Sequence, residues 1–416
     1  MEDTRDRRRS RFLYNIRGHV AGYVFYMLLF VAAGVGIGIL LHGRAVKKWL
    51  REKNFYPVSE VMEQAGYEQA GTDTYHKTEQ GMEIRIAFDF ANDICTKNMY
   101  QFSIQQAYET YGSEVYMSGA VLKDIVNCEL TDTSGDRFQV EPVDLHKVDW
   151  TELSPLIAHA GGAVREKDYS GTYTNSLESL VQNYNLGHRV FEYDFCLTSD
   201  GRLACIHDWE TYGEAGGEAS SQEQWLASKM SGRYTTMMLE DLMDQMLVNR
   251  DFFVVTDTKS FELTDEEIAY QFQLLYDTAV EKDPELVDRF IPQIYSDEMY
   301  DIIMAVYPWN SVIYTAYATK ETGDQIVGFA EEHDNINVIT CPTDDKRFDD
   351  ITKDWIHMLG KKLYTHTVNT YSKMVDYAGS GIDGFYTDFL LPSDAEVYEQ
   401  YKNTSYGEEA LASVVE

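Results

Sequence analysis

Eight short apolar runs, each followed by polar or glycine residues and then by a helical stretch, dominate the chain from Leu153 onward. They read PLIAHAGG, RVFEYDFCL, DFFVVTDTK, RFIPQIYS, NSVIYTAY, NINVITCP, KKLYTHTVN and DGFYTDFL. Buried strands that alternate with helices are typical of a (β/α)8 (TIM) barrel, and a doubly wound open sheet is the alternative because sequence alone does not reveal closure. We therefore predict an α/β protein with a TIM barrel over residues 151–416.

A charge-free run of 22 residues precedes this region, VAGYVFYMLLFVAAGVGIGILL from Val20 to Leu41. At about 1.5 Å per residue, a helix of this length spans roughly 33 Å, enough for the core of a bilayer. A buried core helix and a cleaved signal peptide are the alternatives, although the run exceeds a usual signal segment and basic clusters flank both ends. We predict a transmembrane helix over 20–41 behind a basic tail, 1–19, with the N-terminus inside and the barrel outside the cell membrane.

Charge divides the chain in the same place. The first 53 residues carry 11 lysines and arginines against four acids, whereas the whole chain has a net charge of −34. The rest therefore carries −41, which makes nucleic acid or an anionic membrane surface a poor partner for it. Residues 42–150 read as a juxtamembrane stretch and a small α+β segment whose role stays open. Five cysteines without a CxxC pair predict neither a disulfide scaffold nor a structural zinc site, and a Cys95–Cys128 bridge stays open.

Two carboxylates lie two residues apart in the apolar run VFEYDF. Because residues i and i+2 of a strand point to the same face, Glu192 and Asp194 are expected to project together. Among apolar neighbours these two carboxylates need a positive counter-charge, and a bound cation would supply it. Asp257 in FFVVTDTK would add a third oxygen ligand to that cation. All-oxygen ligation favours a hard divalent ion, so these three residues predict a Mg²⁺ or Ca²⁺ site.

Two histidines each follow an apolar run. His159 follows LIA and precedes two glycines, and His207 follows LACI and precedes an aspartate. A single such histidine is more often structural. Two histidines beside a carboxylate cluster can instead act as acid and base on either side of a phosphate, because imidazole pKa values lie near neutrality. Lys259 shares the face of Asp257 and would offset phosphate charge. We predict His159, His207 and Lys259 as catalytic residues and leave open which histidine is the acid.

These motifs, in this order, resemble the glycerophosphodiester phosphodiesterase family, which belongs with the phosphatidylinositol-specific phospholipase C-like barrels. The resemblance covers roughly Leu153–Pro392 and rests on HAGG, TNSLES, GHRVFEYDFCLTSDGRLACIHD, VVTDTK, LYTHTVN and IDGFYTDFL. It implies a TIM barrel, a divalent metal and hydrolysis of a phosphodiester. It also implies two catalytic histidines, three metal carboxylates and a phosphate-side lysine, which fall on His159 and His207, on Glu192, Asp194 and Asp257, and on Lys259. Asn175 and Ser176 stand where the family has its Glu-Asn-Thr element.

The chain departs from the family pattern at three positions. Ala160 stands where the family usually has a phosphate-binding arginine, Asp257 where it has glutamate, and His366 where it has tryptophan. The missing arginine removes one bidentate phosphate contact, for which we expect Arg165 or His366 to compensate. An insert at about 209–246 is predicted to cap the site, with Trp209 either lining an alcohol pocket or packing within the cap.

Taken together, the sequence predicts a membrane-anchored, metal-dependent phosphodiesterase that hydrolyses a glycerophosphodiester or a related envelope or lipid phosphodiester. Two alternatives stay open at this point. One is a phospholipase of C or D type acting on membrane lipid, and the other is a degenerate barrel that binds phosphodiesters without turnover. The headgroup, the choice between Mg²⁺ and Ca²⁺ and the oligomeric state are not determined by the sequence.

Overall fold

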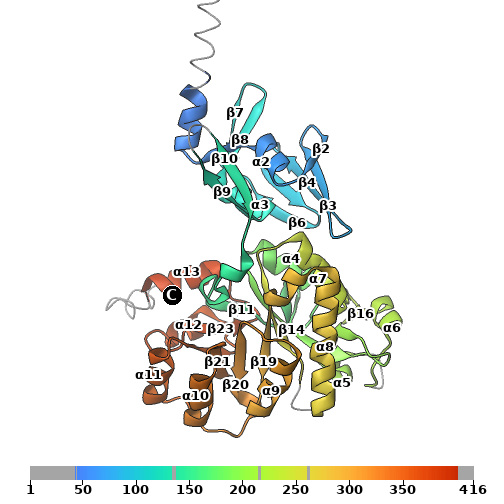
Figure 1. Cartoon of the computed structure of the whole chain (residues 1–416), viewed down its shortest axis with the longest axis vertical. Coiled ribbons are helices and arrows are strands. Elements are labelled where there is room, and N and C mark those ends of the chain that lie inside the picture. Colours follow the sequence, from blue (N-terminus) through green and yellow to red (C-terminus); the bar gives the residue numbers. More distant parts are fainter. Residues whose placement is uncertain (1–42, 44, 134–136, 214–216, 260–262, 402–416) are drawn as a thin grey trace, which may run out of the picture. The chain divides into compact units, whose positions relative to one another are not determined.

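The chain forms two compact units that alternate along the sequence. The computed structural model describes residues 43, 45–133, 137–213, 217–259 and 263–401 (Figure 1). One unit takes the described parts of residues 1–65, 106–123 and 129–141, and the larger takes those of 66–105, 124–128 and 142–416. The segment 42–150 therefore contributes residues to both units.

The structure corrects the prediction of a single-pass membrane protein. Within the described part of the chain, no helix is both long and apolar enough to cross a bilayer. The run 20–41, for which the span was predicted from its charge-free length and its flanking basic clusters, lies outside the described residues, as does the tail 1–19. The predicted cell-membrane localisation, with the barrel outside, is therefore withdrawn.

A three-stranded antiparallel sheet forms the centre of the smaller unit. Its order is β1 (Phe55–Pro57), β8 (Glu114–Ser118) and β7 (Tyr108–Tyr111). Helix α2 (Val58–Gln64) follows β1 directly and buries Val58, Val61 and Met62. Helix α3 (Gly119–Val126) and the pair β9 (Cys128–Asp132) and β10 (Phe138–Pro142) span the positions where the chain passes between the units. All five cysteines are free, so Cys95 and Cys128 are not bridged.

A five-stranded antiparallel meander belongs to the larger unit. Its strands are β2 (Glu68–Gly71), β3 (Thr74–Glu79), β4 (Met82–Asp89), β5 (Ile94–Lys97) and β6 (Tyr100–Ser103). On β6 the Tyr100 ring meets the Tyr184 ring edge to face at 4.9 Å, and its hydroxyl donates a hydrogen bond to Gln245 at 3.1 Å. These contacts join the meander to helices of the barrel.

The barrel itself is closed. Its parallel strands follow one another in chain order, namely β11 (Leu156–Ala158), β14 (Val190–Leu197), β18 (Phe253–Asp257), β19 (Phe290–Ile294), β20 (Val312–Thr315), β21 (Ile336–Pro342), β22 (Lys362–His366) and β23 (Gly384–Thr387). Strand β11 pairs with both β14 and β23, which closes the ring among the described residues. Closure confirms the predicted TIM barrel and excludes the open sheet.

Burial on both faces explains why these strands read as continuous apolar runs. Along β14, Val190 belongs to an interior cluster whereas Phe191 packs toward the helices. The interior cluster fills the end of the barrel at which the strands begin, and Trp150 joins it from a short 3-10 helix, Trp150–Glu152. Tyr364 packs so close to Gly384 that a Cβ there would lie 2.4 Å from its ring. Because apolar side chains fill this end, the polar side chains of the interior lie at the end where the strands finish.

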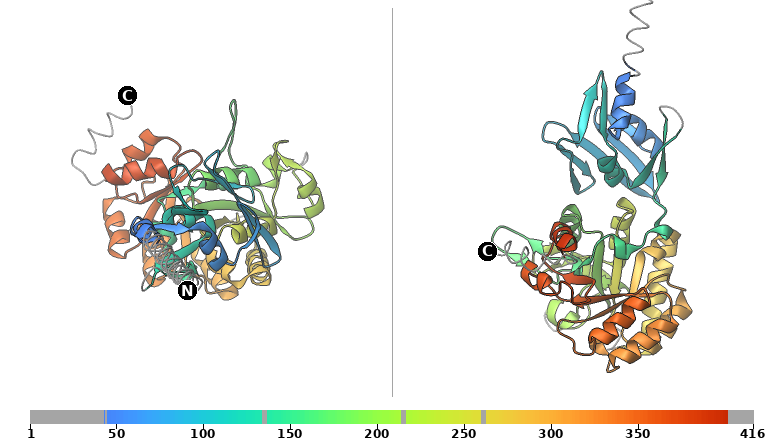
Figure 2. Two further views of the ribbon diagram at one scale, coloured as in Figure 1. Left: turned by 90° about the horizontal axis from the view of Figure 1, so that it is seen from above. Right: turned by 90° about the vertical axis from the view of Figure 1, so that its left-hand side faces the viewer.

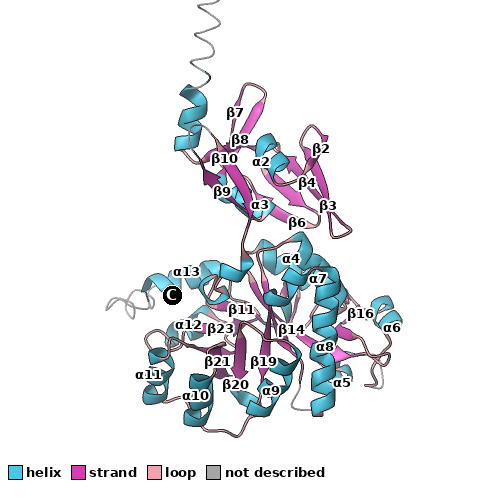
Figure 3. Ribbon diagram, in the orientation of Figure 1, coloured by secondary structure: helices cyan, strands magenta, loops and turns pink. Residues whose placement is uncertain are grey.

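Helices lie around the strands of the barrel (Figures 2 and 3). They are α4 (Leu177–Asn185), α7 (Leu239–Val248), α8 (Asp265–Lys282), α9 (Asp297–Val306), α10 (Gly323–Glu332), α11 (Asp350–Met358), α12 (Tyr371–Asp376) and α13 (Pro392–Tyr401). Several begin with a side chain that caps the free amides of the first turn, as Ser176 does for α4 and Thr264 for α8. Such caps fix the residue at which each helix begins and so fix the end of the loop that precedes it.

The predicted insert 209–246 is built from short elements. They are α5 (Trp209–Tyr212), α6 (Gln222–Ala227), the hairpin β16 (Lys229–Met230) and β17 (Tyr234–Thr235), and the start of α7. The insert follows β15 (Leu203–Cys205), which pairs antiparallel with the end of β14, and a second hairpin is formed by β12 (Val164–Arg165) and β13 (Ser170–Gly171). These elements lie at the end of the barrel where the strands finish.

Candidate active site

His159 stands directly after β11, in the short 3-10 helix His159–Gly161. Its Nδ1 lies 2.9 Å from Oδ1 of Asp388, which follows β23, and Asn369 donates a hydrogen bond to Oδ2 of the same aspartate at 2.7 Å. Burial disfavours the imidazolium, but the hydrogen bond to Asp388 and the charge of Glu192 outweigh it and raise the pKa of His159 to about 9. The contact occupies Nδ1 and leaves Nε2 for a ligand.

Three buried carboxylates stand beside this histidine. Glu192 and Asp194 lie on β14, and the strand register sets Asp194 opposite Asp257 of β18. One oxygen from each of the three lies within 4.8 Å of the others. Burial and the neighbouring charge of Asp194 raise the pKa of Glu192 to about 8, and the positive charges of His159 and Lys259 only partly oppose this rise. Three oxygen donors without nitrogen or sulfur fit a hard divalent cation.

Lys259 already holds two of these carboxylates. Its Nζ lies 2.7 Å from Oδ1 of Asp194 and 2.5 Å from Oδ2 of Asp257. Burial alone would lower the pKa of Lys259, but the carboxylates of Asp257 and Asp194 raise it above its ordinary value, so the ammonium stays charged. Asn175 donates to Oδ2 of Asp194 at 2.8 Å, and the Tyr295 hydroxyl donates to Asp257. The carboxylates are thus fixed from several directions.

His207 approaches from the loop after β15. Its Nδ1 lies 2.6 Å from Oδ2 of Asp208, and Oδ1 of Asp208 accepts the amide of Thr211 at 2.5 Å as the cap of α5. The ring of Tyr173 stands between the two histidines, edge to face, with centroids 4.6 Å from His159 and 5.2 Å from His207. Both imidazoles therefore have Nδ1 held by an aspartate and face one space.

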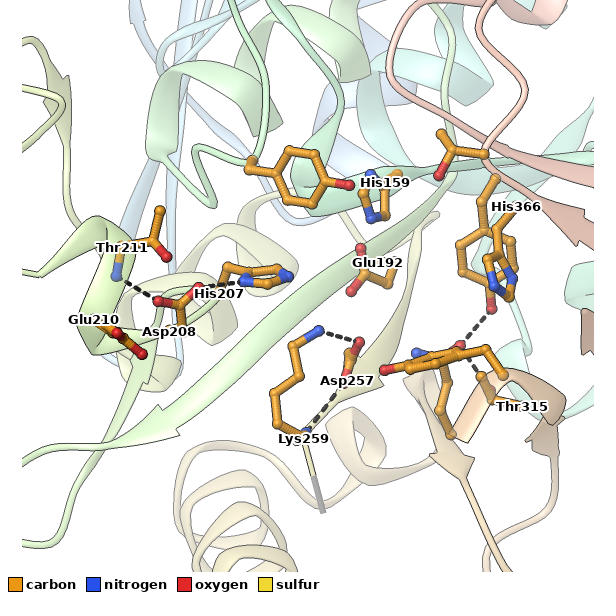
Figure 4. A pocket seen from close by; sticks show the side chains of 15 residues that line it. His159, Glu192, His207, Asp208, Glu210, Thr211, Asp257, Lys259, Thr315 and His366 are labelled. Atoms are coloured by element: carbon orange, nitrogen blue, oxygen red, sulfur yellow. Dashed lines mark hydrogen bonds and ion pairs between the residues drawn. The ribbon is translucent and has the colours of Figure 1, made fainter. Parts of the chain in front are cut away.

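That space is a cavity of about 500 Å³ (Figure 4). It is lined by His159, Tyr173, Glu192, His207, Asp208, Glu210, Thr211, Asp257, Lys259, Gln293, Thr315, Tyr317, His366, Thr367 and Tyr386. His366 has Nδ1 at 3.1 Å from Oγ1 of Thr340, and burial together with the charge of His159 lowers the pKa of His366 to about 4. The third histidine of the cavity is therefore neutral at pH 7.

Comparison with known proteins agrees with this geometry. The model of the glycerophosphoryl diester phosphodiesterase family matches residues 167–391, more than half of the chain. The chain belongs to this family. The resemblance predicted from the motifs is thereby confirmed, and family membership makes the protein a phosphoric diester hydrolase.

Solved structures of the same family are similar to the chain, and no curated protein matches it. A glycerophosphodiester phosphodiesterase from Parabacteroides distasonis is 18% identical with a TM-score of 0.46, covering 59% of this chain and 96% of its own. A phosphodiesterase from Oleispira antarctica, solved in complex with the product sn-glycerol-3-phosphate, is 14% identical with a TM-score of 0.46, covering 60% and 98%. One from Thermotoga maritima is 15% identical with a TM-score of 0.41, covering 59% and 97%.

Two residues predicted to bind substrate do not line the cavity. Arg165 donates from Nη1 to Oδ1 of Asn183 at 2.8 Å and from Nη2 to the carbonyl of Phe389 at 2.6 Å, so its guanidinium is bound within the protein. Trp209 donates to the carbonyl of Leu197 at 2.9 Å and packs against Trp225 at 5.3 Å. The other predicted site residues line the cavity, namely His159, His207, Lys259, Glu192, Asp257 and His366. Asp194 does not line it but lies beside Glu192 and Asp257. Among the described lining residues there is no arginine.

The sequence does not reveal several residues that contact the candidate catalytic groups. Asp388, Asp208 and Tyr173 contact the two histidines, and Tyr295 contacts Asp257. Asp388 follows the last apolar run, and its position there predicts a place at the mouth of the barrel but not its contact with His159. Tyr173 has no sequence signal, because it stands in a loop with a left-handed backbone, φ 55°. Its place follows only from the fold of that loop.

Proposed function

We propose that this phosphodiesterase hydrolyses a glycerophosphodiester with His159 and His207 as acid and base and with one divalent cation. The observation that carries the proposal is the pair of imidazoles that line one cavity, each with Nδ1 bound to an aspartate. An aspartate at Nδ1 fixes the ring and its tautomer, so that Nε2 exchanges protons with the substrate. Family membership supplies the reaction class.

The residues of the cavity divide the proton transfers between them. One imidazole accepts the proton of the attacking hydroxyl, and the other gives a proton to the oxygen of the departing alcohol. The resemblance implies that a neighbouring hydroxyl of the substrate attacks first, which gives a cyclic phosphate that water then opens. Lys259 pairs with Asp194 and Asp257 and would place a positive charge beside the phosphate of a bound substrate.

Glu192, Asp194 and Asp257 would hold the cation, Mg²⁺ or Ca²⁺, because their oxygens lie within 4.8 Å of one another. When bound, a divalent cation stabilises negative charge on the phosphate oxygens and lowers the pKa of a coordinated hydroxyl. Lys259 pairs with Asp194 and Asp257, whereas the buried Glu192 has a raised pKa, and a bound cation would favour its ionised form.

The test is hydrolysis of bis(p-nitrophenyl) phosphate and of glycerophosphodiesters by the full-length protein, with EDTA, Mg²⁺ or Ca²⁺. We expect EDTA to abolish activity and one ion to restore it. His159→Ala and His207→Ala should each lower kcat by about 100-fold or more. His357→Ala is the matched control, since His357, on α11, pairs with Asp383 and does not line the cavity.

Near-normal activity of either cavity variant would refute the assigned roles. Metal binding without turnover of any diester would refute hydrolysis and leave a barrel that binds phosphodiesters. Circular dichroism of each variant separates loss of chemistry from loss of fold.

A further inference from the structure

Two of the three carboxylates in the candidate metal site are held by amides, at one oxygen each. The backbone amide of Ala160 donates to Oε2 of Glu192 at 2.6 Å. The side-chain amide of Asn175 donates to Oδ2 of Asp194 at 2.8 Å, and Oδ1 of Asn175 accepts the backbone amide of Asp194 at 3.0 Å. All four residues are at most 1% exposed. Each of these two carboxylates therefore has one oxygen bound to the protein, because turning it away would leave a buried amide without a partner.

Asp257 has two donors on the same oxygen. The hydroxyl of Tyr295 and the backbone amide of Lys259, the latter at 3.1 Å, both donate to its Oδ1. The backbone of Lys259 is left-handed, with φ 50°, a conformation that is rare for a residue other than glycine. Tyr295 is buried, and its ring meets that of Tyr317 edge to face at 5.5 Å. A carboxylate oxygen has two lone pairs, so these two donors saturate Oδ1 of Asp257.

The other oxygens of the two aspartates face a positive charge. Oδ1 of Asp194 and Oδ2 of Asp257 lie 2.7 and 2.5 Å from Nζ of Lys259. This ammonium stands at the end of a flexible stem, unlike the amides and the phenol that hold the opposite oxygens. A cation at this cluster would therefore receive one oxygen from each of the three carboxylates rather than a bidentate pair.

The number of oxygens that each carboxylate offers distinguishes the two candidate ions. Mg²⁺ takes about six oxygens in nearly octahedral geometry and keeps several waters, whereas Ca²⁺ takes about six to eight and commonly binds carboxylates in bidentate fashion. We propose that Tyr295 is a positioning residue that limits Asp257 to a single ligand oxygen, and that the site thereby favours Mg²⁺ over Ca²⁺. This inference deepens the proposed function and rests on its cation site, for which both ions are otherwise candidates.

Calorimetric titration of the full-length protein with MgCl2 and with CaCl2 measures the ratio of the two dissociation constants without turnover. We expect the wild type to bind Mg²⁺ more tightly than Ca²⁺. Tyr295→Phe frees a lone pair of Oδ1 and should lower this preference by about ten-fold. Tyr314→Phe is the matched control and should keep the wild-type ratio, because this buried tyrosine also donates to an aspartate, Asp297, at 3.1 Å but does not line the cavity.

A wild type that binds Ca²⁺ as tightly as Mg²⁺ would overturn the inference without the use of any variant. An unchanged ratio in Tyr295→Phe, with a native circular dichroism spectrum, would overturn it as well. In either case, hydrolysis that EDTA abolishes and an added ion restores would leave the proposed function standing. A preference for Mg²⁺ that falls in Tyr295→Phe and not in Tyr314→Phe supports the inference even if no diester is hydrolysed, in which case the proposed function alone fails.

Discussion

A buried lysine far from the cavity should make the stability of this protein depend on pH. Lys97, the last residue of β5, is 1% exposed, and its Nζ donates to Oδ1 of Asn127 at 2.6 Å. Burial lowers the pKa of Lys97 from 10.5 to about 7, against the opposing charge of Asp251. Between these two values the unfolded chain holds a proton that the folded chain does not, so stability rises with pH across this window.

The magnitude follows from the size of the shift. Each unit of pKa is worth about 1.4 kcal/mol, so the fall from 10.5 to about 7 corresponds to a cost of about 5 kcal/mol at pH 7. Lys97→Met keeps the length of the side chain and removes this cost. It also removes one hydrogen bond, worth about 1 kcal/mol, while Oδ1 of Asn127 keeps the amide of Arg250 at 3.2 Å. We therefore expect the variant to be more stable at pH 7 by about 3 kcal/mol after a discount for relaxation around the site.

Urea unfolding followed by circular dichroism at pH 7 to 10, under reducing conditions, measures this difference. The wild-type free energy of unfolding should rise with pH more steeply than that of Lys97→Met, and the two should converge toward pH 10. Lys167→Met, at an exposed position, is the control and should keep the wild-type slope. A variant that is less stable at pH 7 and keeps the wild-type slope would show that Lys97 is charged in the folded protein.

Two further predictions concern side chains that hold others in place. Asp388→Asn should lower kcat by about 100-fold with little change in KM, because the amide no longer fixes His159 in the same tautomer. An unchanged kcat in steady-state assays would contradict this role. Arg289→Met should lower the free energy of unfolding by about 3 kcal/mol, since the buried guanidinium donates to the carbonyls of Met246, Asn249 and Phe252 and these acceptors would be left unsatisfied. A midpoint in urea equal to that of the wild type would refute the second prediction.

Much of the barrel could be predicted because parallel strands buried on both faces are continuously apolar, and each of the eight runs became a strand. The carboxylates could also be placed together, since i and i+2 spacing on β14 fixes one face. The contacts of the histidines could not be predicted. Asp388 stands 229 positions from His159 in the chain and contacts it only because the barrel closes. Residue type alone suggested a phosphate contact for Arg165 and left Trp209 between an alcohol pocket and the cap, because it does not distinguish a ligand contact from a hydrogen bond within the protein.

The interleaved course of the chain has a consequence for dissection of the protein. Because residues 66–105 and 124–128 belong with 142–416, a cut near residue 150 would not release an intact unit. It would strip Tyr100 and Phe102 from Tyr184 and leave that aromatic surface exposed to solvent. Fragments with such bare apolar surface aggregate, so a stable core from limited proteolysis should begin well before the first strand of the barrel.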